Sequence, residues 1–147
     1  MKRSYPDRPF TAVGAVVVKD GQVLLIRRGK APSYGIWSIP GGAVHLGESL
    51  RVAARREIRE ECSIEIDLTD VLEAVDRITR DAEGRVQYHY VVIDYLARWA
   101  SGDLTACSDC LEARWVPPSD LSLFQMTSGT ADVIRKLLAA GKQAGVI

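Results

Sequence analysis

The chain has 147 residues, of which 47% are hydrophobic and 26% charged, as in one ordinary globular domain rather than a disordered or fibrous protein. Lysine plus arginine and aspartate plus glutamate number 19 each, so the chain lacks the positive excess that attracts nucleic acids or acidic membranes. The apolar runs are far shorter than the roughly 20 residues of a membrane helix, and the first ten residues lack the apolar core of a signal peptide. We therefore expect a single domain over residues 1–147 in the cytoplasm, with no nucleic-acid or membrane partner.

The first predicted elements form a β-hairpin. Residues 11–18 are rich in β-branched side chains, and the turn Lys19-Asp20-Gly21 leads into a second strand over residues 22–28. A loop rich in Gly, Pro and Ser follows over residues 29–35. A brief apolar stretch then reaches the turn Pro40-Gly41-Gly42.

A helix is predicted next, over residues 48–62, which contain no Gly or Pro and consist mostly of strong helix formers. Leu50, Ala54 and Ile58 recur every four residues and give this helix an apolar face.

The second half of the chain repeats the order of strands followed by a helix. Strand-like runs at 71–79 and 86–97 flank a turn at 81–84, and a short strand at 113–116 ends at two prolines. Apolar residues at helical spacing predict a second amphipathic helix over residues 128–140, which we expect Gly141 to end. This order predicts an α/β fold with a mixed sheet between helices.

Three cysteines, Cys62, Cys107 and Cys110, are too few for a disulfide framework. Cys107 and Cys110 have the spacing of half a zinc site, but no second Cys or His pair stands at a suitable distance. We expect reduced thiols and an ordinary loop around residues 107–110.

Three carboxylates share one face of the first predicted helix. At about 100° per residue, Glu57, Glu60 and Glu61 project within roughly one-third of its circumference. Their spacing alone is typical of a solvated acidic face, but like charges so placed repel by a few tenths of a kcal/mol per pair. A bound cation would remove that repulsion. Hard oxygen ligands select Mg²⁺, Mn²⁺ or Ca²⁺, and Mg²⁺ often shares its coordination with substrate phosphates.

The residues around these glutamates favour the metal site. They form Gly42-x5-Glu48-x7-Arg56-Glu57-Ile58-x-Glu60-Glu61-x-Ser63-Ile64, which resembles the signature of the Nudix hydrolase family. Eight of its nine defined positions are matched over 23 residues, whereas a lone Gly-x-Gly pattern fixes only two or three. The departure is Ser63, where the family has glycine. Glycine suits a left-handed turn, and serine with that backbone angle would cost about 1 kcal/mol.

The resemblance implies an α/β/α sandwich that hydrolyses a nucleoside diphosphate derivative with Mg²⁺ or Mn²⁺. It maps Glu57, Glu60 and Glu61 onto the metal-binding glutamates. It makes the Gly41 or Gly42 carbonyl an additional ligand, because glycine lets backbone approach a metal closely. The metals would stabilise the phosphates and lower the pKa of an attacking water.

Further roles follow from the same resemblance. Arg56 corresponds to the signature arginine that orients a glutamate by ion pairing. Glu48 is expected to serve structure or the outer shell of the metal, and counts among the candidates on the substrate side. Glu57, Asp109 and Glu112 are the candidates for the general base, although a loop carboxylate is more often solvated than catalytic.

Substrate contacts must come from outside the signature. Arg27 or Arg28 could meet a phosphate, although a strand-end arginine usually faces solvent. Trp37 could stack on a base or pack in the core, and Tyr34, Phe10 and Tyr88 are further candidates for stacking.

The runs Gly41-Gly42-x-Val44-x-x-Gly47-Glu48 and His89 to Tyr95 are most similar to the small ADP-ribose pyrophosphatases. The expected substrate is therefore ADP-ribose or a similar small-molecule nucleotide. The proline that several of these enzymes carry beyond the signature is absent here, where Thr79 and Arg80 stand. A nucleoside triphosphate pyrophosphohydrolase and a non-catalytic module that senses a nucleotide stay open as alternatives. Many relatives are homodimers, so a homodimer stays open beside a monomer.

Overall fold

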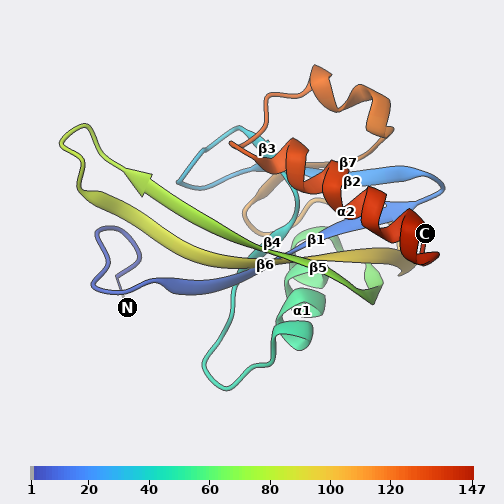
Figure 1. The fold of residues 1–147 in the computed structure, drawn as a ribbon, viewed down its shortest axis with the longest axis horizontal. Helices are drawn as coiled ribbons and strands as arrows, with labels where there is room; N and C mark the ends of the chain where they lie inside the picture. Colours follow the sequence, from blue (N-terminus) through green and yellow to red (C-terminus); the bar gives the residue numbers. More distant parts are fainter. Residues whose placement is uncertain (1) are drawn as a thin grey trace.

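A mixed β-sheet with one helix on each face forms the framework of the computed structural model, which describes residues 2–147 (Figure 1). Helix α1 (Leu50–Cys62) covers one face and α2 (Thr130–Ala144) the other, as the predicted α/β/α sandwich requires. The strands are β1 (Phe10–Lys19), β2 (Gln22–Arg28), β3 (Trp37–Ser38), β4 (Gly41–Ala43), β5 (Glu65–Arg80), β6 (Val86–Ser101) and β7 (Cys110–Val116), and a 3₁₀ helix, η1 (Pro118–Leu123), follows them.

Strand β1 organises the sheet because it pairs with three others. It runs parallel to β6 along almost its whole length and antiparallel to β2, to which the Asp20-Gly21 turn joins it. Both turn residues have positive φ, 50° and 75°, as a tight hairpin turn demands. On the edge opposite β6, which it also presents to β2, β1 pairs with β4 over Ala12–Gly14, and β7 pairs with β2. The predicted hairpin is confirmed, whereas the parallel pairing joins segments about half the chain apart.

Both faces of the central strands are buried, which explains their unbroken apolar sequences. Ala15 and Val17 of β1 pack in a cluster with Ile58 of α1. Val16, on the opposite face, packs in a cluster with Ile134 of α2. One strand therefore contributes to two cores.

Helix α1 has a cap at each end. The Ser49 hydroxyl accepts a hydrogen bond from the Val52 backbone N–H at 3.2 Å, so the helix begins just after the predicted start. At the other end Ser63 adopts the left-handed backbone, with φ 60° and ψ 28°, and its N–H donates to the Arg59 carbonyl. Ser63 therefore keeps the conformation that glycine adopts most easily.

Helix α2 corrects the expectation at Gly141. The helix continues through this glycine to Ala144 and ends at Gly145, which has φ 73°. Gly141 is buried, and a Cβ built there would overlap with the Leu96 side chain of β6. The prediction that Gly141 ends the helix was wrong because this glycine allows close packing of helix on sheet. The apolar side of α2 is buried against the sheet.

Strands β5 and β6 span 16 residues each, longer than predicted, and their hairpin reaches past the body of the sheet (Figure 1). The missed part of β5 begins at Glu65, where acidic residues alternate with the buried Ile66 and the half-buried Leu68. The three cysteines are free thiols. Among residues 2–147, no helix has the length and apolar character to cross a membrane.

Candidate active site

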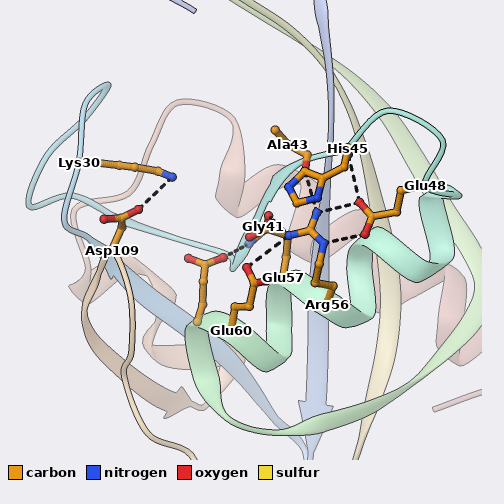
Figure 2. A network of polar contacts seen from close by, with 10 residues as sticks. Lys30, Gly41, Ala43, His45, Glu48, Arg56, Glu57, Glu60 and Asp109 are labelled. Carbon is orange, nitrogen blue, oxygen red and sulfur yellow. Dashed lines mark hydrogen bonds and ion pairs between the residues drawn. The ribbon is translucent and has the colours of Figure 1, made fainter. Parts of the chain in front are cut away.

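Arg56 stands at the centre of a polar network on α1 (Figure 2). Its guanidinium donates to both carboxylate oxygens of Glu48, at 2.6 and 2.8 Å, and to the Ala43 carbonyl at 3.0 Å. The same side chain donates to Glu57 at 2.8 Å and to Glu60 at 3.3 Å. One guanidinium thus links the loop before α1, strand β4 and two of the three signature glutamates. It can do so because its N–H donors point in several fixed directions within one plane.

The network fixes the charge of Glu48. Hydrogen bonds from Arg56 and from the His45 backbone N–H lower the pKa of Glu48 to about 2. Hydrogen bonds to Glu48 and Glu57, together with the charges of these two carboxylates, raise the pKa of Arg56 above its ordinary range. Both groups therefore stay ionised at any physiological pH. This placement fits the outer-shell role expected of Glu48.

Glu61 has a different environment. Its carboxylate accepts a 2.8 Å hydrogen bond from the Gly41 backbone N–H. Burial, reinforced by the charge of Glu57, raises its pKa to about 7, against the opposing effect of the Gly41 N–H and of Lys30 and Arg28. Burial, and after it the neighbouring acid Glu57, therefore disfavour the charged form of Glu61.

Gly41 and Gly42 let β4 lie directly against β1 and α1. A Cβ built on Gly42 would lie 2.5 Å from the Glu57 carboxylate carbon, and one built on Gly41 would overlap with the Val13 carbonyl. Any other residue would have to displace β4 or a signature glutamate. The Gly-Gly pair thus lets the backbone of β4 lie directly against the Glu57 and Glu61 carboxylates.

The donor set fits a hard divalent cation. The available groups are carboxylates and backbone carbonyls, which Mg²⁺ and Mn²⁺ prefer, and a cation would balance the charge of Glu57 and Glu61. Arg56 and the Gly41 N–H now hold these side chains, and among residues 2–147 no three acidic, His or Cys side chains converge closely enough to hold a metal ion. Binding would therefore exchange some of these hydrogen bonds for metal contacts.

The two loop acids proposed as bases have separate surroundings. Glu112, on β7, accepts hydrogen bonds from Arg27 at 3.1 Å and from Arg114 at 2.9 Å, and these arginines lower its pKa. Asp109 is exposed and forms an ion pair with Lys30 at 3.3 Å (Figure 2). Of the two arginines at the end of β2, Arg27 is therefore engaged by Glu112.

A cleft of about 780 Å³ opens beside this network. Its walls come from β1, β4, β5 and β6 and from the loops after β2 and before α2, and they include Gly41, Gly42, Arg28 and Lys30. Burial lowers the pKa of Arg28, whose Nε donates to the Pro32 carbonyl at 2.7 Å. Arg28 and Lys30 thus bring positive charge to the cleft near Glu61.

Trp37 is not among the residues that line this cleft. It packs edge-on against Phe124, with ring centroids 5.0 Å apart, in the core on the α2 side. Its position favours the core-packing alternative over stacking on a base. Tyr88, by contrast, does line the cleft.

The sequence interpretation did not single out Asp94 and Arg77, which also line the cleft. Asp94 interrupts the apolar run from Val91 to Leu96, and an acid within a buried strand is the signal that could have identified it.

Comparisons with known proteins agree with this geometry. Residues 8–137 match the NUDIX domain. The chain is 32% identical over 113 residues to an ADP-ribose pyrophosphatase of Methanocaldococcus jannaschii, covering 77% of this chain and 64% of that protein. It is 31% identical over 134 residues to the nucleoside triphosphatase NudI of Salmonella paratyphi B, covering 84% and 92%. A crystal structure of a MutT NUDIX hydrolase from Burkholderia pseudomallei superposes with a TM-score of 0.77 at 33% identity, over 88% of this chain and 98% of that one.

The sheet, the glutamate helix and these matches define a hydrolase of phosphoric anhydrides. The chain belongs to the Nudix hydrolase family, as its signature predicts. Members of this family in general use divalent metal ions.

Proposed function

We propose that this enzyme hydrolyses the pyrophosphate linkage of ADP-ribose or a similar nucleoside diphosphate derivative, with Mg²⁺ or Mn²⁺ as cofactor. The observation that carries this proposal is the continuity of the cleft: the same walls contain Gly41 and Gly42, which touch the signature glutamates, and the basic Arg28 and Lys30. A volume of about 780 Å³ suits a small-molecule ligand of this size.

The proposed metal ligands are Glu57, Glu60 and Glu61, with a carbonyl of Gly41 or Gly42. A bound metal would neutralise the phosphates and make a water molecule more acidic. The chain itself supplies orientation, since Arg56 holds Glu57 and Glu60 at fixed positions. Arg28 and Lys30 would bind phosphate oxygens.

The three candidates for the general base differ in how free they are to accept a proton. Two arginines, Arg114 and Arg27, hold the Glu112 carboxylate and lower its pKa, which makes it a weaker base. Glu57, within the network, and Asp109, beside Lys30, are the stronger candidates. Asp109→Asn separates them: a loss of kcat with KM unchanged would assign the base to Asp109, and unchanged kcat would leave Glu57.

A second substrate class has support of its own. The Salmonella relative named as a nucleoside triphosphatase is matched over 92% of its length, against 64% for the relative named as an ADP-ribose pyrophosphatase. We therefore keep a nucleoside triphosphate pyrophosphohydrolase as the alternative substrate assignment for the same site.

A substrate panel tests both assignments. The purified chain is incubated with Mg²⁺ or Mn²⁺ and with ADP-ribose, NADH, dinucleoside polyphosphates and the eight common NTPs and dNTPs, and nucleotide products are measured. The proposal expects AMP and ribose 5-phosphate from ADP-ribose, abolished by EDTA. Pyrophosphate release from triphosphates alone would establish the alternative. Saturable binding without turnover of any compound would instead support a nucleotide-sensing module.

A further inference from the structure

Asp94, on β6, is an acidic residue enclosed in the substrate cleft. The residue is 2% exposed. It pairs in register with Gly14 of β1, and a Cβ built on Gly14 would overlap with the Asp94 carboxylate. Glycine weakens the interior of a strand and marks a close approach of other groups. The missing side chain of Gly14 therefore leaves the room that the Asp94 carboxylate occupies.

No group of the protein satisfies that carboxylate. Among residues 2–147 no hydrogen bond or ion pair to Asp94 is found, and the charges that act on it are those of Arg77 and Glu73, both on β5. Arg77 donates instead to the Ser128 carbonyl and, at 3.4 Å, to the Thr130 hydroxyl, while Glu73 accepts from Lys136 at 2.8 Å. Burial raises the pKa of Asp94 to about 6, so at neutral pH it is charged and without a partner.

Asp94 lies in line with the metal site. Gly41, Gly14 and Asp94 are register partners across β4, β1 and β6. Adjacent strands are about 4.8 Å apart, so the Asp94 backbone is about 10 Å from that of Gly41. Along β6 the same face of the sheet carries Tyr90, four residues and about 13 Å away, and then Tyr88. The cleft floor therefore has an acid near the pyrophosphate position and aromatic rings farther along.

We propose that Asp94 determines specificity by accepting hydrogen bonds from the 2′,3′-diol of the ribose next to the scissile pyrophosphate. An ionised carboxylate can only accept, and its two oxygens match two neighbouring hydroxyls. Ribose is the group joined directly to the pyrophosphate, whereas a base lies one sugar farther out, toward the tyrosines. This inference rests on the proposed function and names the part of the substrate that the cleft selects.

Matched ribose and deoxyribose compounds test the inference. Turnover of ADP-ribose is compared with turnover of two analogues, one without the 2′-hydroxyl on the adenosine ribose and one without it on the terminal ribose. In a second series, turnover of ATP and GTP is compared with turnover of dATP and dGTP. We expect the wild type to prefer one diol-bearing compound at least about tenfold in kcat/KM, because a polar group left unpaired by the analogue penalises it. In Asp94→Ala the ratio of kcat/KM for the diol-bearing compound to that for its deoxy analogue should fall to about one, chiefly because the KM for the diol-bearing compound rises. Asp94→Asn should keep part of it, since the amide oxygen still accepts.

The control is Asp67→Asn, which alters an exposed acid of β5 without entering the cleft, and should leave the ratio unchanged. An equal loss on ribose and deoxyribose compounds in Asp94→Ala would assign Asp94 a structural role and overturn the inference. A selective loss on guanine nucleotides would overturn it in favour of contact with the base.

Calorimetric binding of the same compounds without metal separates this inference from the proposed function. Diol-dependent binding that disappears in Asp94→Ala, but without turnover, would refute the proposed hydrolysis and retain the role of Asp94. Turnover or binding with no preference for the diol in the wild type would refute the role of Asp94 alone.

Discussion

The Glu57 carboxylate occupies the space that a side chain at position 42 would need. A Cβ on Gly42 would lie 2.5 Å from its carboxylate carbon, and Arg56 donates to the same carboxylate at 2.8 Å. The Glu57 carboxylate therefore contacts both the backbone of β4 and a guanidinium. Its position depends on the absence of one methyl group.

Gly42→Ala should therefore lower kcat/KM about a hundredfold, the usual effect of moving a catalytic group by about 1 Å. The added methyl must displace Glu57 or β4. Steady-state kinetics with the preferred substrate measure the effect, and the thermal unfolding midpoint shows whether the variant remains folded. Wild-type kcat/KM in a folded Gly42→Ala protein would show that activity does not require Glu57 against β4.

Arg56→Lys should raise the Mg²⁺ concentration needed for half-maximal activity by roughly 10–100-fold, the range for residues that orient metal ligands. A single ammonium cannot replace the contacts of Arg56 with Glu48, Glu57 and the Ala43 carbonyl. Arg55→Lys is the matched control, because Arg55 makes no hydrogen bond or ion pair among residues 2–147. Equal Mg²⁺ dependence in the two variants would contradict the orienting role of Arg56.

The sequence predicted the elements of this fold better than their extents. The apolar runs of β1 and β2 and the uninterrupted helix formers of α1 are local signals, and their positions are confirmed. The end of α2 was predicted wrongly at Gly141, because a glycine that allows close packing inside a helix looks the same in the sequence as a glycine that ends a helix. The start of β5 was missed because its exposed positions are acidic residues, which are uncommon in strands, although they alternate with the apolar Ile66 and Leu68.

In the candidate site, too, some residues could be predicted from local sequence patterns, whereas others depend on how distant strands pair. The helical spacing placed Glu57, Glu60 and Glu61 on one helix face, with Arg56 next to them in the sequence, because spacing within a helix fixes side-chain directions. Which of Arg27 and Arg28 faces the cleft depends on the pairing of β2 with β7, which no local pattern encodes. Asp94 reaches the cleft only through the parallel pairing of β1 with β6.

Ser63→Gly should stabilise the protein by about 0.5–1 kcal/mol, because Ser63 holds a left-handed backbone at φ 60°. Ser63→Ala keeps the strain and removes only the hydroxyl, which lies 3.3 Å from the Cys107 sulfur. It should therefore give no gain. Urea unfolding of the three proteins measures the difference. A gain of the same size in Ser63→Ala would trace it to the hydroxyl instead of the backbone.

Asp94→Asn should stabilise the fold at neutral pH but not in acid. The pKa of Asp94 is about 6 in the folded chain against an ordinary 3.8, so the native state binds more protons than the unfolded state between these values. Stability is therefore lost as pH rises from about 4 to 6, and the loss persists above that. The difference corresponds to at most about 3 kcal/mol. Urea unfolding of both proteins at pH 4 and pH 7.5 measures it. A gain of equal size at both pH values would contradict an origin in the buried charge.

The glutamate site is tested most directly by the Mg²⁺-dependent turnover of Glu60→Gln. Glu60 is half exposed and contacts Arg56 at 3.3 Å, so the change should leave folding intact while removing a metal ligand. Glu65→Gln, which alters an exposed ion pair with Arg59, is the control and should keep wild-type turnover. We expect Glu60→Gln to lose more activity than the roughly 10–100-fold typical of outer-shell residues, with an unchanged unfolding midpoint. If Glu60→Gln hydrolyses the whole substrate panel as fast as the wild type, the assignment of the metal site is wrong.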